Sequence, residues 1–230
     1  SKLAMGRGDK VEIRDLAATN RPAVVELDAG VDAVRSLRWS PDGEWLAAGS
    51  FRRVVIWRAA DWAEQGALVD GLSGRVTGVR FSPDRQRLYA SDSVEGRGGY
   101  LRIFNLGSMK MAKSWRAHAE GVADLDLSTD GRRVVTAGSD RLVQVWESGT
   151  GRLISTLEGH LAQVLGVAFT TNATQVASCG ADRQLRVYDI ATREKISTLG
   201  SHPGAVVAVG WPSAGGGLFA LGQSGALDAY

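Results

Sequence analysis

The sequence predicts an all-β protein built from a repeated unit of about 40 residues. Two kinds of marker recur at intervals of 42 residues, namely His118, His160 and His202, and the aromatic residues Trp146, Tyr188 and Tyr230. Turn-like stretches begin, with spacings of 42, 46 and 42, at Ser40, Ser82, Ser128 and Thr170. No stretch shows the apolar spacing of an amphipathic helix, so each period is expected to contain only strands and turns.

Within each period the pattern predicts four short strands. A first alternating strand, such as residues 33–39, is followed by a polar turn and a strand of small residues, such as 45–50. A tight turn then leads to a strictly alternating third strand, such as 142–146 or 184–189, and a weaker fourth strand, such as 152–157. Four strands per repeat are typical of one blade of a β-propeller. The expected blades are 31–70, 74–116, 121–157 and 163–199, with partial blades at 1–28 and 205–230.

The stretches "LEGHLAQVLGVAF…VASCGADRQLRVYD" and "RAHAEGVADLDLSTDGRRVVTAGSDRLVQVW" resemble the WD40-repeat family. The resemblance covers essentially the whole chain. It implies a single WD40 β-propeller domain over 1–230, with four complete blades and two partial terminal blades. We expect a segment of a seven-bladed ring, or of a six-bladed ring as the alternative, completed by further sequence or by another chain.

A histidine, a hydroxyl and an aspartate lie within thirty residues of one another at His118, Thr136 and Asp140. These residue types form the triad of many hydrolases. A second set recurs 42 residues later, however, and a nucleophile is rarely needed at equivalent positions of a ring. The resemblance implies a structural hydrogen-bonded tetrad in each of these two blades: His118, Thr136, Asp140 and Trp146, and then His160, Ser178, Asp182 and Tyr188. No catalytic residue is therefore expected.

The other blades depart from this tetrad. Leu72 and Phe104 stand at the histidine and tryptophan positions of 74–116, while the blade at 31–70 has Gly30 and Phe51 at the histidine and aspartate positions. The last blade keeps His202, but the repeat spacing places Ser224 at its aspartate position.

Loops at one end of a propeller are the usual binding surface of the family that the sequence resembles. The candidate partner-binding residues on such loops are Phe51, Arg52, Arg53, Arg75, Glu95, Arg97, Arg141, Gln163 and Arg183. Phe51 beside two arginines has the composition of an interface anchor, which we favour over the alternative that the phenyl ring packs into its blade. Between Ser91 and Tyr100 the repeat gains four or five residues, which we interpret as a longer loop. Trp62 lies in a connector, where an exposed side chain is expected.

Composition excludes several classes of function. The formal net charge is +2, with 27 basic and 25 acidic residues, which argues against nucleic acid as a partner. Cys179 is the single cysteine, so the sequence offers neither an internal disulfide nor a cysteine-based metal site. No apolar run is long enough for membrane insertion. No metal or cofactor is expected, and the localisation stays open, with the cytoplasm favoured.

The sequence favours a non-catalytic scaffold that presents a rigid propeller face to protein or peptide partners within a larger assembly. Two alternatives stay open. The loop arginines would suit a polyanion or nucleic acid if they converged on one face. The chain would also suit an accessory propeller of a larger enzyme, because some bacterial propellers joined to c-type cytochrome domains look similar, although no Cys-x-x-Cys-His haem site is present.

Overall fold

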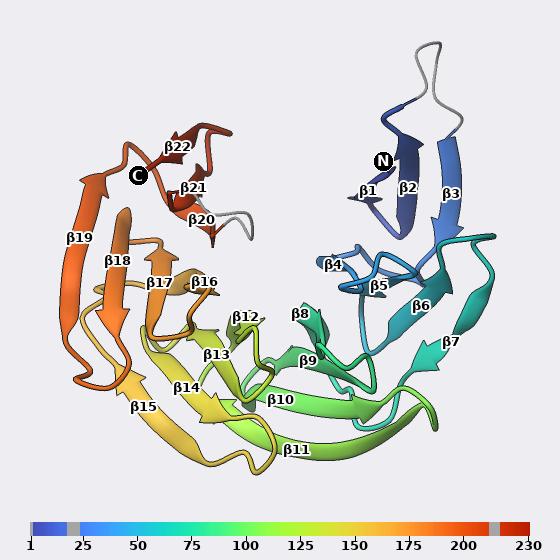
Figure 1. Ribbon diagram of the computed structural model, residues 1–230, viewed down its shortest axis with the longest axis horizontal. Helices are drawn as coiled ribbons and strands as arrows, with labels where there is room; N and C mark the ends of the chain where they lie inside the picture. The colour runs from blue at the N-terminus through green and yellow to red at the C-terminus, as the bar shows by residue number, and fades with distance from the viewer. Residues whose placement is uncertain (1, 18–23, 212–216) are drawn as a thin grey trace. The chain divides into compact units, whose positions relative to one another are not determined.

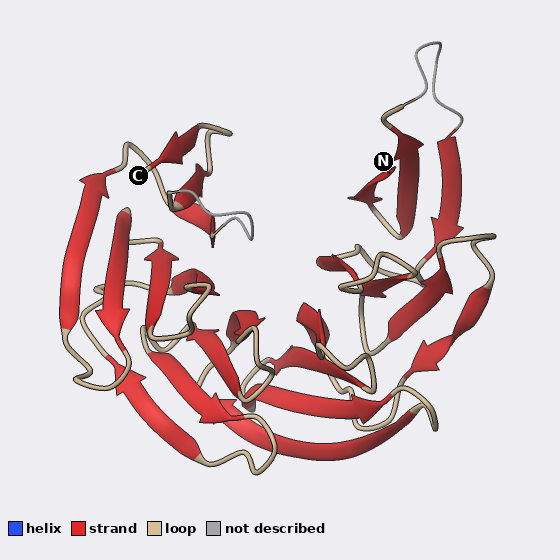
Figure 2. Ribbon diagram, viewed as in Figure 1, coloured by secondary structure: helices blue, strands red, loops and turns tan. Residues whose placement is uncertain are grey.

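The computed structural model describes residues 2–17, 24–211 and 217–230. Within these ranges the chain forms strands, turns and loops and contains no helix (Figure 2). Six separate sheets follow one another along the sequence, four with four strands and two with three (Figure 1). These are the blades of a β-propeller, and they confirm four complete blades with a partial blade on either side.

We number the blades 1 to 6 in chain order. Blade 1 contains β1 (Lys2–Arg7), β2 (Lys10–Asp15) and β3 (Val24–Asp28). Blade 2 contains β4 (Ser36–Trp39), β5 (Trp45–Gly49), β6 (Val54–Arg58) and β7 (Glu64–Leu68). Blade 3 contains β8 (Arg75–Phe81), β9 (Arg87–Val94), β10 (Gly98–Asn105) and β11 (Lys110–His118).

The remaining blades follow the same order. Blade 4 contains β12 (Val122–Leu127), β13 (Arg133–Gly138), β14 (Val143–Glu147) and β15 (Leu153–Leu157). Blade 5 contains β16 (Val164–Phe169), β17 (Gln175–Gly180), β18 (Gln184–Asp189) and β19 (Lys195–Ser201). Blade 6 contains β20 (Val206–Gly210), β21 (Phe219–Gly222) and β22 (Leu227–Ala229).

The chain divides into two compact units. The first comprises residues 1–94 and 102–113, and the second comprises residues 95–101 and 114–230. In the first unit, buried side chains of β6, such as Val54 and Ile56, pack in one cluster with Val76 and Phe81 of β8. In the second, Val143 and Val145 of β14 share a cluster with side chains of β16 and β17. Successive side chains of a strand point to opposite faces of its sheet, so these strands present apolar side chains on both faces. Consecutive sheets can therefore pack face to face.

The inserted residues of blade 3 do not form the longer loop that the sequence predicts between Ser91 and Tyr100. β9 and β10 are instead eight residues each, and a turn over residues 95–97 connects them. The expectation of a loop was wrong because the additional residues continue the strands on either side. Only Glu95, Gly96 and Arg97 remain exposed at the turn.

Candidate functional site

In blade 4 the predicted histidine, hydroxyl, aspartate and tryptophan are joined by hydrogen bonds. His118 Nε2 lies 2.8 Å from Thr136 Oγ1, and His118 Nδ1 lies 2.9 Å from Asp140 Oδ1. The indole of Trp146 donates to Thr136 Oγ1 over 3.0 Å. The Asp140 carboxylate also accepts the backbone N–H of Ala119 over 3.0 Å, so it ties the loop before β12 to the turn after β13.

The direction of this chain follows from what each group can donate. An ionised carboxylate only accepts, so the geometry assigns the imidazole proton to Nδ1 of His118, and Nε2 accepts from Thr136. Burial raises the pKa of Asp140, but the hydrogen bonds that its carboxylate accepts from His118 and from the backbone N–H of Ala119 outweigh burial and leave the pKa below its usual value. The His118 side chain is 0% exposed, so a substrate in solution has no direct access to it.

Blade 5 repeats three of these four links. His160 Nε2 lies 2.8 Å from Ser178 Oγ, and His160 Nδ1 lies 3.0 Å from both oxygens of Asp182. Burial lowers the pKa of His160, although the adjacent Asp182 opposes the shift. The fourth link differs: the buried hydroxyl of Tyr188 has no hydrogen-bond partner among the described residues. The Tyr188 hydroxyl and the Arg186 guanidinium both lie beside the position where a side chain on Gly159 would be.

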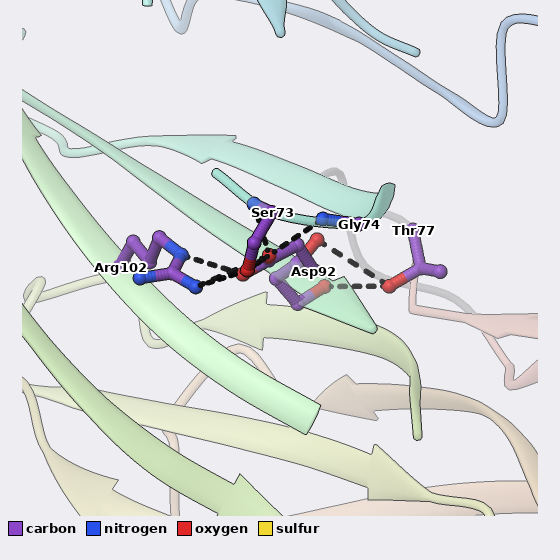
Figure 3. A network of polar contacts seen from close by, with 6 residues as sticks. Ser73, Gly74, Thr77, Asp92 and Arg102 are labelled. Atoms are coloured by element: carbon purple, nitrogen blue, oxygen red, sulfur yellow. Dashed lines mark hydrogen bonds and ion pairs between the residues drawn. The ribbon is translucent and has the colours of Figure 1, made fainter. Parts of the chain in front are cut away.

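Blade 3 contains a different buried polar network, which the repeat markers do not reveal (Figure 3). The carboxylate of Asp92 accepts from Arg102 at two nitrogens, over 2.6 Å from Nε and 3.2 Å from Nη2. It also accepts the backbone N–H groups of Ser73 and Gly74, over 3.0 and 3.2 Å. The side chain of Asp92 is 0% exposed and that of Arg102 is 8% exposed, so the pair is inside the blade.

The position of Asp92 explains how it replaces the tetrad. Asp92 lies opposite Val76 in the sheet, as Gly138 lies opposite Val122 in blade 4. A side chain at Gly138 would overlap the histidine and aspartate of that blade. Blade 3 lacks both, which leaves room for the Asp92 carboxylate. The signal in the sequence is an aspartate at a position where three other blades have glycine, namely Gly138, Gly180 and Gly222.

Blades 6 and 2 have further arrangements. His202 lies with Nε2 2.9 Å from the hydroxyl of Tyr230 and Nδ1 3.2 Å from Asp228. Asp228 is on β22, at the repeat position of an arginine in blade 5, so the 42-residue spacing does not identify it. In blade 2 the hydroxyl of Ser50 donates to the carbonyl of Ala29 over 2.9 Å.

Four candidate partner-binding residues lie in the first unit. Phe51 is 41% exposed, and its backbone forms an isolated bridge with Arg75. Arg75 is exposed and pairs with Asp32 over 3.1 Å. Arg52 is exposed and has a positive φ of 61°. Arg53 is half-buried instead, and its stem lies against the position where a side chain on Gly30 would be.

The other candidates lie in the second unit and are all exposed: Glu95, Arg97, Arg141, Gln163 and Arg183. Arg141 and Arg183 occupy the same turn position as Arg52 and also have positive φ values, of 71° and 63°. Blade 6 has Gly225, with φ 86°, in that turn.

Two exposed apolar side chains were not singled out in the sequence. Val31 is 89% exposed and Leu161 is 80% exposed, and each directly follows the histidine position of its blade. The backbone N–H of Leu161 donates to Asp182 over 3.0 Å, which holds it beside the turn that contains Arg183. The repeat therefore places an apolar side chain and an arginine on adjacent loops. We call Val31 with Arg52, and Leu161 with Arg183, the apolar–arginine pairs.

The described residues contain no cluster of three or more histidine, cysteine, aspartate or glutamate side chains that is suited to a metal ion. No helix that is long and apolar enough to cross a membrane occurs in the described ranges. Cys179 is fully buried, and burial raises the pKa of its thiol.

Consecutive antiparallel blades with a His–Ser/Thr–Asp network define a β-propeller repeat protein. Known sequences identify the family: the WD domain, G-beta repeat matches residues 24–58, 109–147 and 151–189. The chain belongs to the WD40-repeat family.

Proteins of similar sequence have diverse names. Cell division cycle 20.1, cofactor of APC complex, from Arabidopsis thaliana is 24% identical over 148 residues, which are 63% of this chain and 31% of that protein. Actin-interacting protein 1-2 from the same plant is 31% identical over 112 residues, or 48% of this chain and 18% of that protein. Pre-mRNA-splicing factor cwf17 from Schizosaccharomyces pombe is 26% identical over 113 residues, or 48% and 32%. The chain thus spans at most about a third of the length of these relatives.

Proposed function

We propose that the chain is a non-catalytic scaffold that binds protein or peptide partners through the loops that carry the apolar–arginine pairs. The observation that carries the proposal is the exposure of Val31 and Leu161 at equivalent positions of two blades. In each pair the apolar side chain lies on a loop next to one that carries an arginine, and arginine is one of the residue types enriched at binding hot spots. The relatives, which include a cofactor of the APC complex and an actin-interacting protein, support the same class of function.

The loops are held rigidly enough to display these residues. In blade 2 the bond from Ser50 to Ala29 ties the loop before β4 to the turn after β5. In blade 5, Asp182 does the same for Leu161. A preformed surface loses little conformational entropy when a partner binds.

Burial of the histidine networks supports the non-catalytic reading. His118 and His160 are 0% and 1% exposed at the side chain, and each is saturated by hydrogen bonds inside its own blade. Ion pairs between arginines and carboxylates also weaken the alternative of polyanion binding. Arg75 pairs with Asp32, and Arg85 pairs with Asp42 and Glu44.

The proposal is tested by selecting binders from a phage-displayed library of twelve-residue peptides against the folded protein. A peptide that contacts one of the apolar–arginine pairs should bind about tenfold, or 1.4 kcal/mol, more weakly to the variant of that pair, which is Leu161→Ser or Val31→Ser. Ile196→Ser is the matched control, because Ile196 is 52% exposed on the outer strand β19. Peptides that bind both loop variants like wild type, or that are lost with Ile196→Ser, would refute this placement.

A further inference from the structure

A cavity of about 700 Å³ lies in the first unit, away from the loops discussed above. Its wall includes Lys2 of β1, Trp39 of β4, Glu44, Trp45 of β5, Arg58 of β6 and Ala59. The volume is within the range of small-molecule sites. The proposed scaffold function uses none of these residues.

Two indoles line the cavity and a third adjoins it. Trp39 and Trp62 form an edge-to-face pair with ring centroids 6.0 Å apart. Trp39, Trp45 and Trp62 are all only half-buried, and within the described residues none of their indole N–H groups has an acceptor. Because they are half-buried, these side chains offer both flat aromatic faces and N–H donors to a ligand.

The fold itself does not require tryptophan at position 45. The carbonyl of Trp45 accepts the N–H of Ser40, and the same bond is made by Arg87, Arg133 and Gln175 in blades 3, 4 and 5. Polar side chains therefore serve at this position in three other blades. The indole of Trp45 is a feature of blade 2 that its strand geometry does not explain.

Position 62 supports the same conclusion. Trp62 has a φ of 61°, a backbone region in which a bulky side chain is strained. Its N–H donates to the carbonyl of Arg58 over 2.8 Å, as the N–H of Gly151 donates to Glu147 in blade 4. Blade 5 has Arg193 in the equivalent turn, with a φ of 63°, so the turn accepts glycine or arginine and does not require the indole of Trp62.

The charge that faces the cavity is positive. Lys2 Nζ donates to the carbonyl of Ala59 over 2.9 Å and lies 4.6 Å from the centroid of the Trp62 ring. That leaves two ammonium N–H groups beyond the Ala59 bond. The charge of Lys2 also attracts Asp15, which lies opposite it in the sheet, but the two side chains form no salt bridge. The other charges are matched, because Arg58 pairs with Asp61 over 2.6 Å and Glu44 pairs with Arg85 over 2.9 Å.

We propose that this cavity binds an aromatic ring that carries a carboxylate, with the ring against Trp39 and Trp45 and the carboxylate on Lys2. A quaternary ammonium, which aromatic cages also bind, is disfavoured because the Lys2 ammonium already lies over the Trp62 face. A wholly apolar ligand would leave that ammonium and the indole N–H groups without a partner. The same chemistry is available in a free aromatic acid and in an acidic, tryptophan-containing peptide.

The test titrates the folded protein with 2-naphthoate and with uncharged 2-naphthamide, measured by isothermal calorimetry and ligand-observed NMR. The naphthoate should bind at least about fivefold more tightly than the amide. Trp45→Gln should abolish binding of both ligands, and Lys2→Met should remove the preference for naphthoate while leaving the amide unchanged. Arg87→Gln is the matched control, because it makes the corresponding change in blade 3.

Three results would overturn the proposal. The first is equal binding of the acid and the amide to wild type, and the second is binding that is unchanged by Trp45→Gln. The third is no binding of naphthoate or of N-acetyl-Glu-Trp-amide at millimolar concentration. Tighter binding of naphthoate would identify a free aromatic acid as the source, and tighter binding of the peptide would identify a protein segment. Neither result depends on the apolar–arginine pairs, so failure here leaves the proposed function intact.

Discussion

At the scale of single residues, the blades meet the same need with more than one chemistry. The loop before the inner strand must be fixed to the turn after the second strand, and backbone N–H groups there need an acceptor. Blade 4 supplies Asp140, held by His118, whereas blade 3 supplies Asp92, held by Arg102. The carboxylate is common to both, and its cationic or imidazole partner differs.

We predict that Asp92→Ala lowers the free energy of unfolding by about 3–5 kcal/mol, because it leaves the buried Arg102 without its carboxylate. The double variant Asp92→Ala/Arg102→Met should recover part of that loss, since it removes the buried charge as well. Urea denaturation of wild type, the double variant and the two single variants, Asp92→Ala and Arg102→Met, measures this coupling. Additive effects of the two substitutions would show that the pair contributes nothing as a pair.

The two tetrads provide a second prediction. Trp146→Phe removes the donor to Thr136 and should cost about 1–2 kcal/mol. Tyr188→Phe removes a buried hydroxyl that has no hydrogen bond among the described residues, so its effect should be close to zero or stabilising. Thermal and urea unfolding of the two variants decide the matter. Equal losses in both would mean that Tyr188 is bonded in solution like Trp146.

At the scale of elements, the tight turns between second and third strands combine strain with exposure. Arg52, Arg141 and Arg183 have positive φ, whereas blade 6 has Gly225 at that position. Glycine adopts this region without steric cost, so the arginines are not explained by the backbone. Their guanidinium groups are consistent with the proposed role in binding partners.

We therefore predict that Arg141→Gly or Arg183→Gly raises the free energy of unfolding by about 0.5–1 kcal/mol, since relief of the strain exceeds the added entropy of the unfolded chain. Gly225→Ala should have the opposite effect. Both are measured by urea denaturation. A loss of stability in the arginine variants would show that the side chains stabilise the turn.

Blade 5 also predicts a dependence of stability on pH. Burial lowers the pKa of His160 in the folded protein from its ordinary value of 6.5, so the unfolded chain binds the proton first as the pH falls. Stability should decrease below about pH 6.5, and again where the pKa values of Asp140 and Asp182, lowered from 3.8, are crossed. His160→Gln should show a smaller decrease between about pH 7 and about pH 5. An unchanged pH dependence in that variant would contradict the assignment.

The repeat markers predict the strands well because each marker is part of the repeated pattern. The stretches 184–189 and 142–146 correspond to β18 (Gln184–Asp189) and, within one residue, to β14 (Val143–Glu147). Asp92 and Asp228 were not predicted, because each supplies its carboxylate from a position where the other blades have a different residue type. Exposure of Val31 and Leu161 also depends on the folded loop, so no periodicity reveals it.

At the scale of the whole molecule, we expect each compact unit to act as a rigid support for exposed loops. The first unit carries the Val31–Arg52 pair and the second carries the Leu161–Arg183 pair. The central claim is that partners bind at these loops and not along the outer strands of the blades.

The most direct test is amide hydrogen exchange of the protein with and without a peptide selected from the library. We predict slower exchange at residues 29–33 and 50–53 if the peptide binds the Val31–Arg52 pair, or at residues 158–163 and 180–183 if it binds the Leu161–Arg183 pair. Exchange in the outer strands β7, β11, β15 and β19 should not change. Protection confined to those outer strands, with the loops unaffected, would contradict it.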